Sequence, residues 1–228
     1  MKKKFAEGLS FYKIFIIFIV CSIFGTFYEQ IYHLINHFVR TGIFEWSIRQ
    51  SVLYGPFNFV YGVGGVLMVC LLVPIKENWK AVYGFDCLLG GSTEYFLSYL
   101  QEKLFGTVSW DYTNRLLNID GRTTIPYMMF WGLLCLFAVY KIYPFVSKMI
   151  EKIPSNIGVI VSKCLLVFIL LDGLISLIAV TRQSLRNNGV EPYTVIGRLC
   201  DTYYTDEYLG RISFCEFGLS WRELHGAR

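Results

Sequence analysis

The stretch that decides the fold is Ile157–Val180, IGVIVSKCLLVFILLDGLISLIAV, in which Lys163 and Asp172 are the only charged residues. As an α-helix, its 24 residues would be about 36 Å long, which exceeds the roughly 30 Å hydrocarbon core of a bilayer. The run is continuous and does not alternate between polar and apolar residues, as a strand of a membrane barrel would. It therefore predicts a membrane-spanning helix.

Four other apolar runs have spanning length, namely Leu9–Phe27, Phe57–Val73, Val82–Leu100 and Ile125–Phe145. The second of them has Pro56 and Pro74 at its two ends, where proline fits a helix boundary. The five runs predict an all-α fold, a polytopic membrane helix bundle over residues 1–180 with a short polar C-terminal tail over residues 181–228. We expect the fifth helix to continue into the tail and to stop at Asn187-Asn188-Gly189.

The composition is typical of a membrane protein. Hydrophobic residues make up 54% of the chain and charged residues 17%, against about 25% charged residues in soluble domains. The Lys and Arg residues are scattered between apolar runs, which argues against nucleic acid as a partner. Met1-Lys2-Lys3-Lys4 resembles the start of a signal peptide, but we expect an uncleaved first span because no small-residue cleavage site follows. Free thiols are expected for the seven cysteines, with a Cys200–Cys215 disulfide as the alternative.

Basic residues predict the orientation of the chain, because cytoplasmic loops carry the excess of Lys and Arg. With the N-terminus in the cytoplasm, nine basic residues fall on that side and five in the outer loops (Arg40, Arg49, Lys103, Arg115 and Arg122). The six Arg of the tail would lie outside with six acidic residues that balance them. We therefore expect a multi-pass cell-membrane protein with a cytoplasmic N-terminus.

Polar residues recur inside the predicted spans, where they are costly unless they face other helices or a water-filled cavity. In the third run a spacing of four places them on one helix face: Asp86, Gly90, Glu94, Ser98 and Glu102. The helices predicted around the first and second runs carry similar stripes. The first stripe contains Ser22, Thr26, Glu29, His33 and His37. The second contains Tyr54, Asn58, Tyr61, Gly62 and Gly65. In the predicted orientation, Glu29, Glu94 and Asp172 converge on the outer end of the bundle, with Arg122 as a counter-charge. This convergence is open to two interpretations, a polar cavity for a cation or polar solute, or interhelical bonds that only fix the packing.

The sequence lacks the common catalytic motifs. It contains no GxxxxGK[ST], so the chain does not hydrolyse ATP by a phosphate loop, and it contains no GxSxG or HExxH. The spacing of Glu29, His33 and His37 would suit a zinc ion, but boundary histidines are more often solvated. We therefore predict neither a metal site nor a cofactor.

The segment after the third run carries a recognisable pattern. Trp110-Asp111-Tyr112, followed by Asn118-Ile119-Asp120-Gly121-Arg122, is similar to a signature close to W-D-Y-S-x-x-P-F-N-I-N-G-R. Other pieces follow the expected order across about residues 14–145: Tyr28-Glu29, Tyr54-Gly55-Pro56, Tyr61-Gly62, Glu94-Tyr95, Glu102-Lys103-Leu104-Phe105-Gly106 and Trp131-Gly132. Together they resemble a bacterial membrane family, the CmpB-like ABC transporter permeases, or Putative ABC-transporter type IV. The chain departs from the family pattern at Thr26, Thr113, Leu116-Leu117 and Asp120.

The resemblance implies a permease-like subunit in the bacterial cytoplasmic membrane that binds or moves a polar solute. Such a subunit would need a separate ATPase subunit as a partner besides the lipid bilayer, and a homo-oligomer is compatible with it. The predicted substrate-binding residues are Glu29, Tyr54, Asn58, Glu94, Glu102, Trp110, Asp111, Asn118 and Arg122. Within the signature, Asp111 should accept hydrogen bonds from local amides or pair with Arg122, and Gly121 should adopt a positive φ.

Two functions of other classes stay open from the sequence. One is a membrane-embedded enzyme for a lipid-linked substrate, with paired carboxylates as acid and base. The other is a regulatory or scaffold protein without chemistry of its own. The segment after the third run is either a substrate gate or an ordered seal of the bundle.

Overall fold

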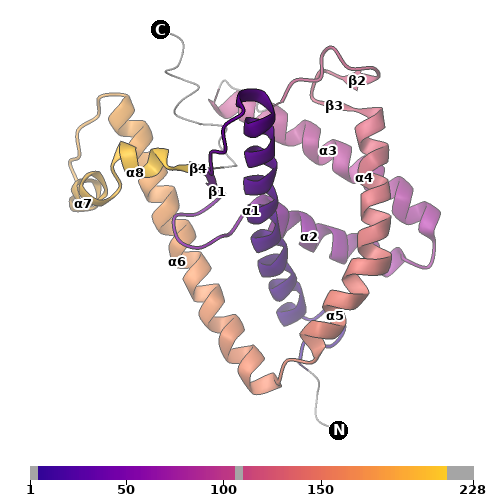
Figure 1. Cartoon of the computed structure of the whole chain (residues 1–228). Helices are drawn as coiled ribbons and strands as arrows, with labels where there is room; N and C mark the ends of the chain where they lie inside the picture. The colour runs from indigo at the N-terminus through magenta and orange to yellow at the C-terminus, as the bar shows by residue number, and fades with distance from the viewer. Residues whose placement is uncertain (1–4, 106–109, 215–228) are drawn as a thin grey trace. The chain divides into compact units, whose positions relative to one another are not determined.

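A computed structural model describes residues 5–105 and 110–214 of the chain (Figure 1). These residues form α1 (Phe11–Thr41), α2 (Phe59–Leu72), α3 (Trp79–Phe105), α4 (Ile125–Phe137), α5 (Tyr143–Glu151), α6 (Ser155–Asn187), α7 (Val195–Tyr203) and α8 (Asp206–Gly210). Two short strand pairs accompany them: β1 (Ile48–Gln50) lies parallel to β4 (Ile212–Phe214), and β2 (Asn118–Ile119) lies antiparallel to β3 (Thr123–Thr124). The predicted all-α fold is confirmed.

The chain divides into two compact units. The first unit comprises the residues up to Phe18 together with Val63–Ile160, and the second unit comprises Ile19–Gly62 together with the residues from Val161 onward. By these bounds α1, α2 and α6 each contribute residues to both units.

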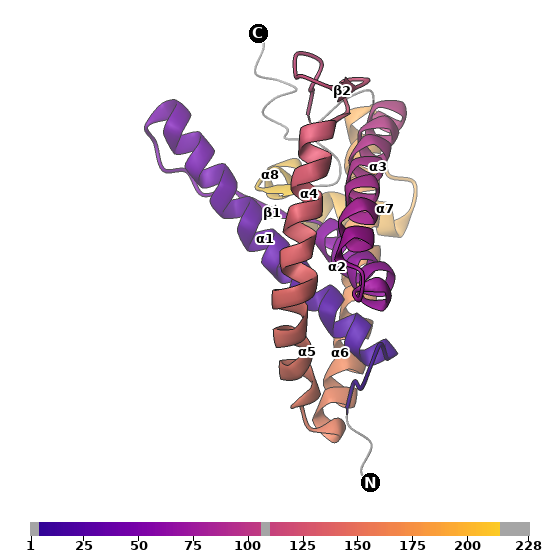
Figure 2. The ribbon, with the colours of Figure 1, turned by 90° about the vertical axis from the view of Figure 1, so that its right-hand side faces the viewer.

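In the first unit α3 and α4 lie side by side, and glycines on both helices allow the close approach (Figures 1 and 2). A Cβ atom on Gly90 of α3 would lie 3.0 Å from the Cβ of Trp131 on α4. In the reverse direction, a Cβ atom on Gly132 of α4 would lie 2.5 Å from the Sγ of Cys87 on α3. Small residues that admit a neighbouring helix are typical of packing between membrane helices. The buried apolar cluster of this unit contains Leu72, Val82, Cys135 and Val139.

α4 and α5 form one continuous rod, joined by a π-helical turn at Ala138–Ile142 (Figure 2). Pro144 follows this turn and has no backbone N–H to continue the regular hydrogen-bond ladder, which accounts for the local widening. Near the end of the rod, the buried Lys13 of α1 donates a 2.7 Å hydrogen bond to Ser147 and pairs with Glu151. The charge that α1 carries within its apolar run is therefore compensated.

In the second unit α6 packs against the non-helical segment of residues 51–58. Ser176 Oγ accepts a 2.8 Å hydrogen bond from the N–H of Leu53, and Asp172 Oδ1 accepts a 3.1 Å hydrogen bond from the N–H of Tyr54. Both side chains are buried, so polar residues of α6 satisfy backbone amides that no helix ladder satisfies. Leu53 and Ala179 also join Leu209 and Ile212 in a buried apolar cluster.

The end of α6 follows the sequence prediction. The helix ends at Asn187, and Gly189 has a φ of +75°. Beyond it the chain folds back, and α7 and α8 lie beside the C-terminal part of α6 (Figure 1). Asp201 of α7 pairs with Arg182 at 2.8 Å and with Arg186 at 2.6 Å, and Arg186 also pairs with Asp206.

Within the described part of the chain, three helical stretches are long and apolar enough to cross a membrane: α1, the α4–α5 rod (Ile125–Glu151) and α6. The second predicted span corresponds to a shorter apolar helix, Phe59–Ile75, whose final turn contains Pro74. The third corresponds to α3, which has the length but not the apolarity, because the stripe with Asp86 and Glu94 runs along it. A membrane protein with apolar helices is thus shown, whereas the number of five crossings stays a prediction.

Candidate functional site

Glu94 lies half-buried on α3, and both of its carboxylate oxygens accept hydrogen bonds from hydroxyl groups. Tyr112 Oη donates to Oε1 at 3.0 Å, and Thr123 Oγ1 donates to Oε2 at 2.7 Å. Among the residues that the structure describes, no Lys, Arg or His forms an ion pair with Glu94. An ionised Glu94 therefore keeps an unbalanced negative charge within a predicted span.

The segment between α3 and α4 is held in shape by its own signature residues. Trp110 Nε1 donates a 2.8 Å hydrogen bond to the carbonyl oxygen of Arg122, which ties the two ends of the segment together. Asp111 Oδ1 accepts from both the hydroxyl and the N–H of Thr113, and these bonds lower the pKa of the Asp111 carboxyl. The prediction that Asp111 accepts from local amides is confirmed.

A tight hairpin places Thr123 opposite Glu94. Asp120, Gly121 and Arg122 connect β2 to β3, and Asp120 and Gly121 both have left-handed φ values, 50° and 67°. The N–H of Arg122 closes the turn with a 2.9 Å hydrogen bond to the carbonyl oxygen of Ile119. Asn118 supports the turn, because its Oδ1 accepts a 3.0 Å hydrogen bond from the N–H of Gly121. The positive φ predicted for Gly121 is confirmed, and the signature sequence Asn-Ile-Asp-Gly-Arg therefore has a direct geometric reason.

Arg122 is the residue before Thr123 in the sequence and interacts with the polar stripe of α3 to which Glu94 belongs. Its guanidinium pairs with Glu102 and donates a 3.2 Å hydrogen bond to Ser98. It also lies over the rings of Tyr95 and Tyr99, with its Cζ 5.8 and 5.5 Å from their centroids. The hydrogen bond from Arg122 lowers the pKa of the Glu102 carboxyl, so this pair is charged at neutral pH. Because Glu102 balances Arg122, the guanidinium does not neutralise Glu94.

A second acidic position lies in the second unit. Glu29 of α1 accepts a 2.8 Å hydrogen bond from Tyr61 Oη of α2. Its other oxygen lies 3.5 Å from His33 Nε2 and 3.7 Å from Arg49 Nε. Glu29 therefore forms ion pairs, whereas Glu94 forms none with the described residues.

Tyr54 and Asn58 hold the segment of residues 51–58 against its neighbours. The Tyr54 hydroxyl is 3.0 Å from the hydroxyl of Tyr204, and its N–H donates to Asp172. Asn58 is 1% exposed, and its N–H donates a 3.0 Å hydrogen bond to the carbonyl oxygen of Ser22. These contacts fix the local fold of the second unit.

The structure brings six of the nine predicted binding residues together in the first unit: Glu94, Glu102, Trp110, Asp111, Asn118 and Arg122. Glu29, Tyr54 and Asn58 belong to the second unit and have separate partners there. The convergence of Glu29, Glu94 and Asp172 stays a prediction. Sequence reasoning did not identify Tyr112 and Thr123 as the hydrogen-bond donors to Glu94, although both lie within or beside the signature.

Two shallow grooves occur in the second unit, and both have mainly apolar walls. One lies between α6 and α7, and the other runs along α6 between Lys163 and Leu171. Neither contains an acidic lining residue. Within residues 5–105 and 110–214, no three His, Cys, Asp or Glu side chains gather as metal ligands. Cys200 is a free thiol, and Cys215 lies outside the described residues.

Comparison with known proteins supports the resemblance seen in the sequence. A family model described as Putative ABC-transporter type IV matches residues 16–177, which include the whole segment around Glu94 and the signature. Searches of curated proteins and of solved structures gave no match. The matched region covers well over half of the chain and ends within α6. The chain therefore belongs to the Putative ABC-transporter type IV family.

Proposed function

We propose that the chain is the membrane-embedded, permease-like subunit of a transporter, and that it binds a polar solute with a cationic group at Glu94. The observation that carries the proposal is the environment of this carboxylate, which among the described residues accepts its hydrogen bonds from two neutral hydroxyl groups. Keeping an unpaired charge inside a predicted membrane span is costly, and intramembrane carboxylates are functional candidates for that reason.

The electrostatic environment of the Glu94 carboxylate favours a cation as the bound group. At about 4 Å and an effective dielectric constant of about 20, two opposite unit charges attract each other by about 4 kcal/mol. The two hydroxyl donors supply only dipoles. An ammonium or guanidinium group that approaches Glu94 would therefore add an ion pair that the described part of the chain does not provide. The Tyr112 and Thr123 hydroxyls can rotate and accept from such a donor, because a hydroxyl both donates and accepts.

The neighbouring residues suit the roles of positioning and gating. Arg122 of the hairpin contacts Ser98 one turn beyond Glu94 on α3 and pairs with Glu102 two turns beyond it. Trp110 closes the base of the signature segment. In this proposal, Asp111 and Asn118 fix the segment that delivers Tyr112 to the carboxylate. Glu29, Tyr54 and Asn58 of the second unit are further residues that we propose to bind the solute.

Transport would be driven by a separate ATPase subunit, since this chain lacks a phosphate loop. We further propose that residues 1–180 form the membrane domain, with the N-terminus in the cytoplasm and residues 181–228 as an appended tail. The excess of basic residues on the N-terminal side supports this orientation.

The proposal is tested by comparing wild-type cells with cells that lack the chain. Metabolites and lipids are quantified in both, and the tagged chain is purified from membranes to identify proteins bound to it. We expect a polar cationic metabolite to change in distribution and an ATPase to copurify. A change confined to lipid species, with no ATPase bound, would contradict the proposal and favour a membrane-embedded enzyme.

A further inference from the structure

α7 presents an apolar surface that the rest of the second unit leaves uncovered. Val195, Ile196, Leu199 and Tyr203 are between 51% and 70% exposed. With 3.6 residues per turn, the four side chains fall within about 100° of one another around the helix axis. They therefore form a continuous apolar face, rather than scattered single residues that would need no explanation.

The remaining sides of α7 either pack against the neighbouring elements or are polar. Gly197 and Cys200 are buried, and Asp201 forms the ion pairs with Arg182 and Arg186 of α6. Arg198 and Thr202 are exposed on the polar side. The apolar face is thus distinct both from the side packed on α6 and from the side suited to water.

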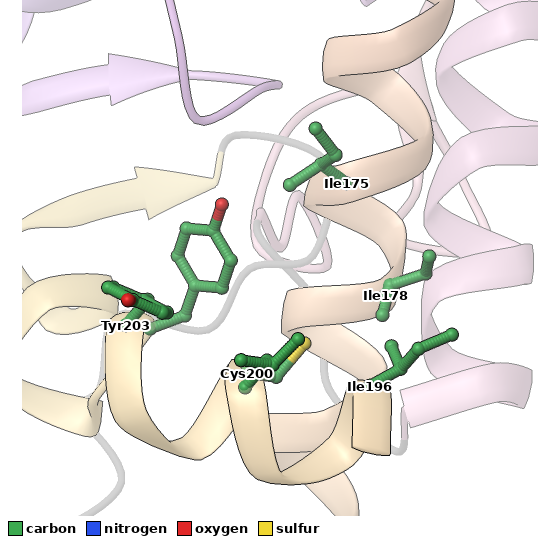
Figure 3. A pocket seen from close by; sticks show the side chains of 7 residues that line it. Ile175, Ile178, Ile196, Cys200 and Tyr203 are labelled. Carbon is green, nitrogen blue, oxygen red and sulfur yellow. The ribbon is translucent and has the colours of Figure 1, made fainter. Parts of the chain in front are cut away.

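The apolar face continues onto α6. Ile196 and Leu199 of α7 and Ile175 and Ile178 of α6 line a shared groove of about 240 Å³ (Figure 3). Leu171 and Leu174 lie one turn before these isoleucines on the same face of α6, and each is 55% exposed. α6 is one of the helices long and apolar enough to cross a membrane, so its exposed leucines are placed to contact acyl chains. The uncovered face of α7 adjoins this exposed apolar surface of α6 at the shared groove.

We propose that α7 is an interfacial helix whose apolar face binds phospholipid at the edge of the bilayer. Tyr203 suits the headgroup zone, and Arg198 can place its guanidinium beside the lipid phosphates while its methylene groups cover apolar surface. The ion pairs with Arg182 and Arg186 fix α7 at the level of the span, near the point where α6 leaves the hydrocarbon. α7 lies beyond the family match of residues 16–177, and the inference does not depend on the solute proposed for Glu94.

The test places a photoreactive benzoylphenylalanine at single positions of the full-length chain in native membranes. Tyr203→benzoylphenylalanine and Leu199→benzoylphenylalanine probe the apolar face, and Thr202→benzoylphenylalanine is the matched control on the polar side. After irradiation, mass spectrometry of the purified chain identifies what each probe has captured. Melting temperatures of the three variants show whether each one is folded.

We expect phospholipid adducts at positions 199 and 203 at several times the yield found at position 202. A crosslinked dimer at these positions would overturn the proposal and identify a second copy of the chain as the occupant. Capture of another protein, or an equal lipid yield at all three positions in folded variants, would overturn it as well. If the Leu199 variant fails to fold, the Tyr203 variant decides, because it replaces one exposed aromatic side chain with another.

Discussion

The contact between α1 and α2 gives a sharp prediction for Gly25→Ala. A Cβ atom added at Gly25 would overlap the Cβ and Cγ atoms of Tyr61, which lie too close to the α2 backbone to move without it. The same Tyr61 donates its hydroxyl hydrogen bond to Glu29. The substitution therefore has to displace α2 from α1 and to weaken that hydrogen bond.

The magnitude follows from three contributions. Forcing an extra methyl group into a packed contact costs about 1–3 kcal/mol. Loss of a hydrogen bond to a charged group costs about 1.5–3 kcal/mol, and the better helix propensity of alanine returns at most about 1 kcal/mol. The expected net loss is about 1.5–5 kcal/mol, which at about 2–4 °C per kcal/mol lowers the melting temperature by about 3–20 °C.

The assay is thermal unfolding of the detergent-purified protein, followed by tryptophan fluorescence and by size-exclusion chromatography. Gly64→Ala is the matched control, because an added Cβ atom at Gly64 of α2 meets nothing within 4 Å. Tyr61→Phe removes only the hydroxyl group and should account for the hydrogen-bond share of the loss. A Gly25→Ala protein that melts at or above the wild-type temperature would refute the close packing of these helices.

Three further predictions concern other contacts. Ser176→Ala should lower the free energy of unfolding by about 1–3 kcal/mol, because it leaves the buried Leu53 N–H without an acceptor. Ser184→Ala, at an exposed site of α6, should leave the melting temperature unchanged. Equal melting temperatures of the two variants would contradict the role of Ser176 as the acceptor. Arg122→Lys should increase proteolytic cleavage between α3 and α4. Lysine cannot reproduce the contacts that the planar guanidinium makes with Glu102, Ser98 and the rings of Tyr95 and Tyr99. Unchanged cleavage would refute this prediction. The pKa values of Asp201 and Asp206 are lowered chiefly by hydrogen bonds from Arg182 and Arg186, respectively. The stability that these ionised carboxylates add is therefore present at neutral pH. It is lost as the pH falls below about 4 and through the pKa values of the two groups in the folded protein. Hydrogen exchange of α7, corrected for its intrinsic pH dependence, should then rise relative to that of α6, and a constant ratio would contradict the linkage.

Local patterns in the sequence predicted the parts of the fold that local physics determines. The run Ile157–Val180 predicted α6 because a continuous apolar stretch of that length has few other stable states. Asn187-Asn188-Gly189 predicted its end, and Gly121 predicted a left-handed position, because glycine permits conformations that other residues avoid. The spacing of polar residues on α3 placed Glu94 on a face with Ser98 and Glu102.

The hydrogen-bond partners of Glu94 could not be predicted in the same way. Tyr112 and Thr123 are 18 and 29 residues away in sequence, and only the hairpin between α3 and α4 brings their hydroxyls to the carboxylate. The pairing of β1 with β4 is still less local, since each strand has three residues and no alternating pattern marks them. In α3 the polar stripe with Glu94 lowers the apolarity by which a membrane span is recognised, so the third crossing stays a prediction.

The proposed role of the Glu94 carboxylate in binding the solute is tested by complementing cells that lack the chain. The readout is the cellular metabolite profile, compared for wild type, Glu94→Gln and the matched control Glu77→Gln, whose side chain is exposed between α2 and α3. We predict that wild type and Glu77→Gln restore the profile, whereas Glu94→Gln does not, although it reaches the membrane at wild-type abundance. Full restoration by Glu94→Gln would contradict the claim, because the neutral amide keeps the size of the side chain and loses only its charge.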